Sequence, residues 1–218
     1  NNRFHITADR PMMLYAKDVD KNGFDELIPA YYIKNKSDQY ELFPALDRNQ
    51  LAEQIPSVKK KYLLHADYAG ITMKQFSSDY GDDGWMKLQC ETSTSAWIEN
   101  LGNGKFKTHV LPVEAQFAPV NSIVADDING DGNVDLIVAG NEYQMALSAG
   151  RYDASYGLAL MGNGKGDFTP VNMFNSGLII DGDVKDMKLL HTKNRGKLLI
   201  AAPNDSKLKT FVLNSSNQ

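Results

Sequence analysis

The stretch DINGDGNVD at residues 127–135, followed directly by the apolar run LIVA at 136–139, decides the expected fold. Counting from the first Asp, oxygen-bearing side chains occupy positions 1, 3, 5 and 9, which are Asp127, Asn129, Asp131 and Asp135. Gly132 at position 6 permits a sharp turn because it has no Cβ to forbid a positive φ. The carbonyl of Asn133 at position 7 can complete a shell of hard oxygen ligands, which suits calcium. The stretch therefore predicts a calcium-binding loop.

The residues after this loop argue against an EF-hand. An EF-hand requires a bidentate Glu at position 12 and a helix after the loop, whereas position 12 here is Val138. The run 136–139 is apolar, contains β-branched residues and is bounded by Gly140 and Asn141, which predicts a buried strand. The sequence thus indicates a calcium loop that leads into a strand.

A second copy of the loop, DVDKNGFDE, lies at residues 18–26. It aligns position for position, and its candidate ligands are the side chains of Asp18, Asp20, Asn22 and Glu26 and the carbonyl of Phe24. A lone acidic turn of this kind is usually a solvated hairpin, and that alternative stays open for each copy. Two copies with one spacing, both before an apolar strand, favour metal binding.

A second repeated motif sets the period of the chain. LGNGKF at 101–106 matches MGNGK at 161–165, and its Asn-Gly pairs are hairpin signals. The two motifs lie 60 residues apart, whereas the two acidic loops lie 109 apart. The first repeat therefore carries an insertion, which we place at about residues 47–89.

Together these motifs resemble a known family. The loop and strand at 127–137, with the segments 100–106 and 117–120, look like the FG-GAP/VCBS repeat. The string 150–157 is similar to a segment of bacterial secreted FG-GAP/VCBS proteins, which often carry an ASPIC/UnbV module. The resemblance covers roughly residues 12–213. It implies an integrin-α-like β-propeller, in which each blade has four antiparallel strands and the calcium loop joins the first two.

The expected fold is mainly β, with residues 1–218 as one propeller-like region. We expect a first blade at 12–112, with the helical insertion, a second at 120–175 and a degenerate third at 183–215. Propellers typically need four to eight blades. We therefore favour a fragment of a longer propeller, with an open arc or completion by a second copy as the alternatives.

The insertion shows a helical pattern in which apolar residues recur at spacings of three and four. Asp47 is the expected N-cap, and Pro56 predicts a break. A second short helix is expected from about residue 67 to 77. The first blade is then expected to continue through strands at 85–90, 94–100 and 105–111. Cys90, the single cysteine, is expected to pack in the core.

The later repeats differ in regularity. The middle one predicts strands at 122–126, 135–139, 157–161 and 168–173, with a long surface loop at 141–155. We expect Arg151 to pin this loop by pairing with a carboxylate. The last repeat predicts strands at 183–187, 198–202 and 207–213, and its basic segment 191–197 is expected to bind no calcium. Residues 4–7 are expected to supply its missing strand beside 207–213.

Composition excludes several classes of function. The chain has 218 residues and a net charge of −4, so nothing suggests nucleic-acid binding. No apolar run approaches the roughly 18 residues of a membrane span. The four histidines are scattered, and no nucleophile elbow or phosphate loop is present.

These observations leave two function classes. The favoured one is a non-catalytic, calcium-stabilised β-propeller module that is secreted, periplasmic or at the cell surface, and that binds protein or glycan through loops on one face. The alternative is a carbohydrate-active enzyme domain with its site on the same face. A pocket holding two carboxylates outside the acidic loops would favour the enzyme.

Overall fold

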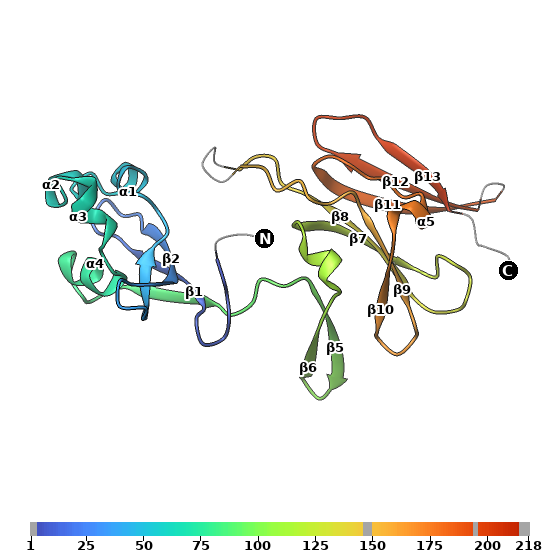
Figure 1. Ribbon diagram of the computed structural model, residues 1–218, viewed down its shortest axis with the longest axis horizontal. Coiled ribbons are helices and arrows are strands. Elements are labelled where there is room, and N and C mark those ends of the chain that lie inside the picture. The colour runs from blue at the N-terminus through green and yellow to red at the C-terminus, as the bar shows by residue number, and fades with distance from the viewer. Residues whose placement is uncertain (1–3, 146–149, 194–195, 214–218) are drawn as a thin grey trace. The chain divides into compact units, whose positions relative to one another are not determined.

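A computed structural model describes residues 4–145, 150–193 and 196–213. The protein is mainly β, with 42% strand and 15% helix, and its strands form four antiparallel sheets, none of which is closed. The chain divides into two compact units, residues 2–93 and 94–218 (Figure 1). The predicted mainly β class is confirmed, and the number of propeller blades stays a prediction. No helix in the described ranges is long and apolar enough to cross a membrane.

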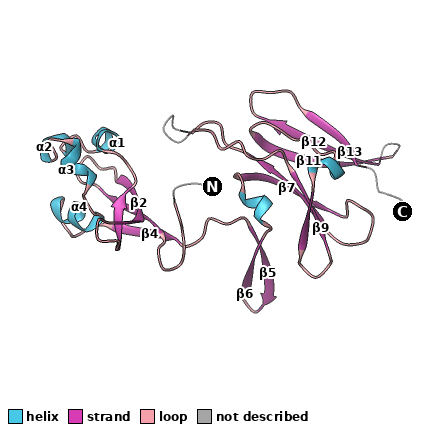
Figure 2. Ribbon diagram, viewed as in Figure 1, coloured by secondary structure: helices cyan, strands magenta, loops and turns pink. Residues whose placement is uncertain are grey.

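The first unit contains one four-stranded sheet with a helical cap on one face. Its strands follow the order β3-β2-β1-β4, and their bounds are β1 (Met12–Lys17), β2 (Glu26–Lys34), β3 (Tyr40–Pro44) and β4 (Met86–Cys90). Figure 2 shows the helices gathered beside this sheet, namely α1 (Arg48–Gln54), α2 (Val58–Lys61), α3 (His65–Ala69) and α4 (Met73–Asp79).

The cap forms where the sequence predicted the insertion. Asp47 caps α1 by accepting from the backbone N–H groups of Asn49 and Gln50, as expected for an N-cap. Pro56 lies between α1 and α2, which confirms the predicted break. Apolar residues of the helices pack on Ile28 and Ala30 of β2, and they include Leu51, Ile55, Val58, Met73 and Phe76.

The opposite face of this sheet is partly exposed. Met86 and Leu88 of β4 are 50% and 53% exposed. Cys90 is also exposed, and its thiol lies 3.0 Å from the carbonyl oxygen of Thr92. The prediction that Cys90 packs in the core is wrong, because β4 is an edge strand and all five of its residues are exposed.

The strand order of the first unit also differs from the expected blade. The sequence did not predict β3, which follows β2 through a tight turn. Asn35 closes this turn, because its backbone N–H donates to the carbonyl of Gln39 and its side chain accepts from the N–H groups of Ser37 and Gln39. Because β3 pairs with the free edge of β2, β4 does not follow β2 in the sheet and pairs with the free edge of β1. The strands β5 (Ala96–Gly102) and β6 (Lys105–Val110) form a separate two-stranded sheet in the second unit.

The second unit contains the predicted middle repeat and last repeat. The middle sheet runs in sequence order through β7 (Val120–Asp126), β8 (Asp135–Gly140), β9 (Leu158–Gly162) and β10 (Phe168–Val171). The last sheet consists of β11 (Val184–Thr192), β12 (Gly196–Pro203) and β13 (Lys209–Leu213), and the unit also has η1 (Val113–Gln116) and α5 (Met173–Ser176). The strands predicted for both repeats are confirmed.

Every residue of β8 is buried, because both faces of the middle sheet are covered. Ile137 and Ala139 pack on one side with residues of the last sheet, including Met187, Leu199 and Ala201. Leu136 and Val138 pack on the other side with Leu111, Ala115 and Leu160.

The predicted pairing of residues 4–7 with 207–213 is wrong. Thr7 instead forms a bridge with Arg10, and β13 pairs with β12 alone among the described strands. The Phe4 ring packs edge-on against Tyr31 of β2, with centroids 4.9 Å apart. This aromatic contact holds the segment within the first unit.

Candidate functional site

The two acidic loops occupy equivalent places in the two units. The first joins β1 to β2, and the second joins β7 to β8, each within an antiparallel pair. Gly23 and Gly132, both at position 6, have φ values of 92° and 89°. This left-handed conformation is the reason that the turn requires glycine.

The loops share a set of backbone hydrogen bonds to side-chain oxygens. In the first loop, Asp18 accepts from the N–H groups of Asn22 and Gly23, at 3.0 and 2.9 Å. In the second, Asp127 accepts from Asp131 and Gly132, at 3.1 and 3.0 Å. Positions 1, 5 and 6 are therefore joined in the same way in both loops.

The bonds from positions 3, 5 and 9 match as well. The position 3 side chains, Asp20 and Asn129, each accept from the N–H of position 5. The position 5 side chains, Asn22 and Asp131, each accept from the N–H of position 7. Position 9 accepts from position 2 in both loops, as Glu26 from Val19 at 2.7 Å and Asp135 from Ile128 at 2.9 Å. The two loops therefore have the same local conformation.

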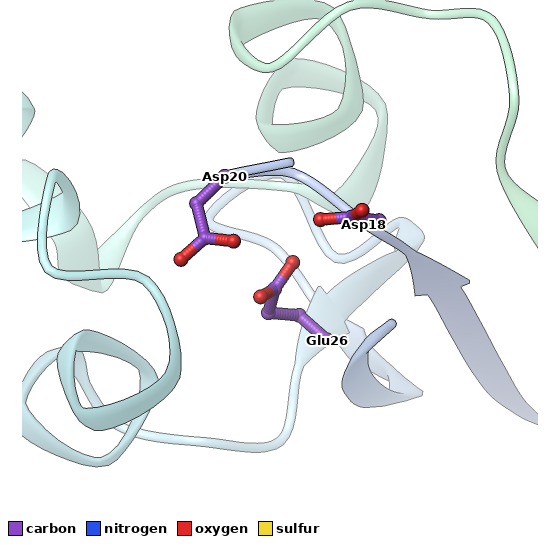
Figure 3. A group of neighbouring side chains, drawn as sticks. All are labelled: Asp18, Asp20 and Glu26. Carbon is purple, nitrogen blue, oxygen red and sulfur yellow. The ribbon is translucent and has the colours of Figure 1, made fainter. Parts of the chain in front are cut away.

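In the first loop, three carboxylates converge. Oxygens of Asp18, Asp20 and Glu26 all lie within 4.8 Å of one another, and Figure 3 shows these groups turned toward a common space. Glu26 is 5% exposed, whereas Asp20 is exposed. No ion pair involves these three carboxylates within the described ranges. Their mutual repulsion would be relieved by a cation between them.

The second loop holds its carboxylates differently. Asp135 is fully buried, and its Oδ2 accepts from the backbone N–H groups of Ile128 and Asn129. Its Oδ1 accepts from Gly162 at the end of β9, at 2.8 Å. The N–H of Asn133 and the amide of Asn129 lower the pKa of the Asp131 carboxyl. The three carboxylates of this loop do not converge as those of the first loop do, and position 3 is an amide.

A lysine from the last sheet contacts the start of the second loop. Lys197 Nζ donates to the carboxylate of Asp126 and to the carbonyl of Asp127, and His191 Nε2 lies 3.1 Å from Asp126. The hydrogen bond from Lys197 is the main reason that the pKa of Asp126 is lowered. The sequence reasoning noted that segment 191–197 is basic, but it missed this contact because Lys197 lies 70 residues from Asp127.

The Gly-Asn-Gly turn after β9 packs closely on the second loop. A Cβ at Gly162 would lie 2.0 Å from the carbonyl oxygen of Val134, and one at Gly164 would lie 2.3 Å from Oδ1 of Asn133. The two turns line an open pocket of about 380 Å³, whose lining also includes Asp167 and Phe168. Glycine in this motif is therefore required by the approach of the acidic loop.

The donor sets of both loops fit a hard cation. Side-chain oxygens of Asp18, Asp20, Asn22 and Glu26 would hold it in the first loop, and those of Asp127, Asn129, Asp131 and Asp135 in the second. Each carboxylate oxygen has two lone pairs, so an oxygen that accepts a single N–H still has one for a metal. In the second loop these oxygens include Oδ2 of Asp127 and Oδ1 of Asp135, whereas the other oxygen of each carboxylate already accepts two. The roles predicted for the carbonyls of Phe24 and Asn133 stay predictions.

The predicted surface loop at 141–155 has a different anchor from the one expected. Arg151 lies over the ring of Tyr143, at 4.9 Å from its centroid, and pairs with no carboxylate in the described part of the chain. The expected ion pair is therefore wrong. The base of the loop is held by buried Asn141, which donates to the carbonyls of Ser155 and Gly182. Residues 146–149 of the predicted loop lie outside the described residues.

Comparison of the chain with models of protein families, with curated proteins and with solved structures gives no match.

Proposed function

We propose that this protein is a non-catalytic, calcium-binding β-sheet module of the FG-GAP/VCBS type that acts outside the cytoplasm. It would be secreted, periplasmic or at the cell surface, and would bind protein or glycan. Carbohydrate-active catalysis is the alternative that the sequence left open.

One observation carries the calcium proposal. Two loops in separate units have the same spacing of oxygen-bearing side chains and the same backbone hydrogen bonds to them. In the first loop this conformation brings the oxygens of three carboxylates within 4.8 Å of one another. An ordinary solvated hairpin has no need to gather like charges, because their repulsion destabilises the turn.

Calcium would act structurally, by crosslinking the connection between β1 and β2 in the first unit and between β7 and β8 in the second. Extracellular calcium modules bind with Kd values of about 10⁻⁴–10⁻³ M. At millimolar calcium, such a site stabilises the folded state by on the order of 1 kcal/mol. The carboxylates of the loops would stay ionised as ligands, which leaves them unsuited to act as a general acid.

The chain allows each unit to be followed separately, because it contains two tryptophans, one in each unit. Trp85 donates to the carbonyl of Gly81 in the first unit, and Trp97 donates to that of Gly166 in the second. In the Trp97→Phe variant the fluorescence of Trp85 would report thermal unfolding of the first unit. In the Trp85→Phe variant the fluorescence of Trp97 would report that of the second. Each would be measured in EDTA and in millimolar calcium, with magnesium as the metal control.

We expect calcium to raise the Tm of both units. Asp18→Ala should remove the effect in the first unit and Asp127→Ala in the second. Asp25→Ala is the matched control, because Asp25 is an exposed acid of the first loop at a position that is not a candidate ligand. If neither Tm responds to calcium and calorimetry detects no binding, the acidic loops are solvated hairpins and the proposal is wrong.

A further inference from the structure

The hairpin β5–β6 is a two-stranded sheet with an uncovered apolar face. Ala96 pairs with Val110, Ile98 with Thr108 and Asn100 with Phe106, so these side chains share one face. On this face Ile98, Phe106 and Val110 are 65%, 64% and 63% exposed. An isolated two-stranded hairpin is marginal in water, whereas three or more strands with an apolar face are stable.

The other face of the hairpin is already engaged. Trp97 stacks on His109 with ring centroids 4.2 Å apart, and its indole N–H donates to Gly166. His109 in turn lies 2.8 Å from the carboxylate of Glu99. These contacts fix the orientation of the hairpin and leave the face with Ile98 outward.

The backbone groups of β5 that point away from β6 can be assigned. The N–H of Leu111 donates to the carbonyl of Ser95 just beyond the ends of the strands. Directly opposed antiparallel pairs alternate between bonded and non-bonded types. Ala96, Ile98 and Asn100 therefore direct their N–H and C=O groups to the open edge.

The hairpin β9–β10, which has the same Gly-Asn-Gly motif, indicates which kind of element pairs with the open edge of β5. Residues of β9 pair along the same edge with β8, as Leu160 with Leu136 and Leu158 with Val138. By the 60-residue spacing of the Gly-Asn-Gly motifs, Ile98 corresponds to Leu158. The edge of β5 thus corresponds to one that is occupied by an antiparallel strand in the second repeat.

The counterpart of β8 in the first unit cannot accept β5 on that side. That counterpart is β2, and its edge away from β1 is bonded to β3 through residues 30–34. Further along this edge, the N–H of Ala45 donates to Pro29, and the side chain of Gln54 bonds both the N–H and the carbonyl of Leu27. The strand that the repeat would use is therefore fully engaged.

We propose that β5 pairs with β5 of a second copy of this chain, antiparallel and centred on Ile98. This register places Ile98 opposite its own equivalent and Ala96 opposite Asn100, so their outward backbone groups bond one another. Glu99 then lies opposite Trp97 of the second copy, and the two Glu99 side chains stay apart. The result is a four-stranded sheet whose apolar face combines Ile98, Phe106 and Val110 from both copies.

Charge selects β5 over β6 as the interface. The equivalent pairing of two β6 strands, centred on Thr108, would place Lys107 opposite His109. That arrangement sets two cations against each other whenever the histidine is protonated. The β5 register brings no like charges together.

The test is the oligomeric state, measured by sedimentation velocity over a range of protein concentrations. We expect a reversible dimer. Ile98→Pro removes an outward N–H and an apolar side chain while leaving the β5–β6 bonds, and should weaken the dimer at least about tenfold. Thr108→Pro is the matched control. Thr108 pairs directly with Ile98 within the hairpin, and its own N–H points to the opposite edge, that of β6. This substitution should leave the dimer unchanged.

Disulfide trapping provides a second test that does not depend on proline. In a Cys90→Ser background, Ile98→Cys should give a crosslinked dimer on mild oxidation, since opposed Cα atoms lie about 5.5 Å apart in such a pair. Thr108→Cys should not. A protein that is monomeric at every concentration, or one that crosslinks through position 108 alone, would overturn the proposal. Neither result bears on calcium binding.

Discussion

The two acidic loops have one conformation but two kinds of support. The first gathers the carboxylates of Asp18, Asp20 and Glu26 within 4.8 Å, with no ion pair to balance them in the described part of the first unit. The second buries Asp135 under three backbone N–H donors and has Lys197 at its start. The first loop therefore lacks the compensating contacts that the carboxylates of the second loop have.

This difference predicts an unequal response to calcium. Without a cation, repulsion destabilises the first loop more than the second. The sequence alone favours the opposite order, because the second loop has the more usual ligands. The position of compensating charge, which sequence spacing does not reveal, is what distinguishes the two loops.

The largest expected effect is at the turn that supports the second loop. Gly162→Ala should destabilise the second unit by about 3 kcal/mol or more, because the new Cβ would collide with the backbone carbonyl of Val134. Gly102→Ala changes the corresponding glycine of the other motif, which has no atom within 4 Å. Its φ of 81° predicts a strain cost of only about 1 kcal/mol. Urea unfolding followed by circular dichroism would measure both, and equal losses would contradict the packing argument.

The next effect concerns position 9 of each loop. Asp135→Asn, measured in EDTA, should destabilise the second unit by about 2 kcal/mol, because an amide N–H₂ would face a backbone donor in a fully buried site. Glu26→Gln should cost little in EDTA, because the amide oxygen can still accept the one bond from Val19 and the repulsion among the three carboxylates of the first loop is reduced. The tryptophan signals of the two units would report these changes separately. A larger loss for Glu26→Gln would reverse the comparison.

Acid should lower the stability of the first unit through Asp79, a carboxylate of the helical cap. Burial raises the pKa of Asp79, but hydrogen bonds from the Tyr62 hydroxyl and Lys61 outweigh this, so the pKa is lowered from 3.8. A lowered pKa means that the carboxylate contributes stability above its ordinary pKa and loses it as the pH falls below 3.8, through the folded-state value.

Asp79→Asn should therefore destabilise the first unit by roughly 1 kcal/mol at neutral pH. It should also flatten the stability curve of this unit in acid. Tyr62→Phe is the matched control, because it removes one hydrogen bond and keeps the carboxylate. Unfolding followed by Trp85 fluorescence from neutral pH down to about pH 2, which covers the range below the ordinary pKa, would test this. An unchanged acid limb in Asp79→Asn would contradict it.

The smallest expected effect comes from removing the lysine beside the second loop, so that this loop, like the first in the described ranges, has no cation near its carboxylates. Lys197→Met removes the cation beside Asp126 and Asp127, and should raise the calcium affinity of the second loop roughly threefold. Lys193→Met is the control, because it removes an exposed charge near the same turn. Calorimetric titration would measure both. A weaker affinity in Lys197→Met would show that the lysine supports the binding conformation.

Much of the local structure could be predicted from the sequence. The strands around the second loop follow from its apolar run and hairpin turns, and the helical cap follows from the spacing around Leu51 and from Asp47. The turn conformation at Gly23 and Gly132 also follows, because only glycine adopts it readily.

The long-range pairings could not be predicted in this way. Strand β3 is short, and its tight turn at Asn35 gives a weak signal beside the longer strands. Which edge β4 joins depends on which edge β3 has already filled, and no local pattern records that. Lys197 was missed for the same reason, since its contact with Asp127 exists only after two sheets have packed.

The strand order of the first unit has a consequence for how the protein folds. Met12 of β1 pairs with Cys90 of β4, so this pairing closes a chain loop that contains the whole helical cap. Such closure is entropically costly and slow compared with the middle sheet, whose neighbouring strands are consecutive in the chain. During synthesis, β1 has to wait until residue 90 has left the ribosome. The N-terminal unit, although it is made first, is therefore expected to complete its sheet by a slower route than the unit that follows it.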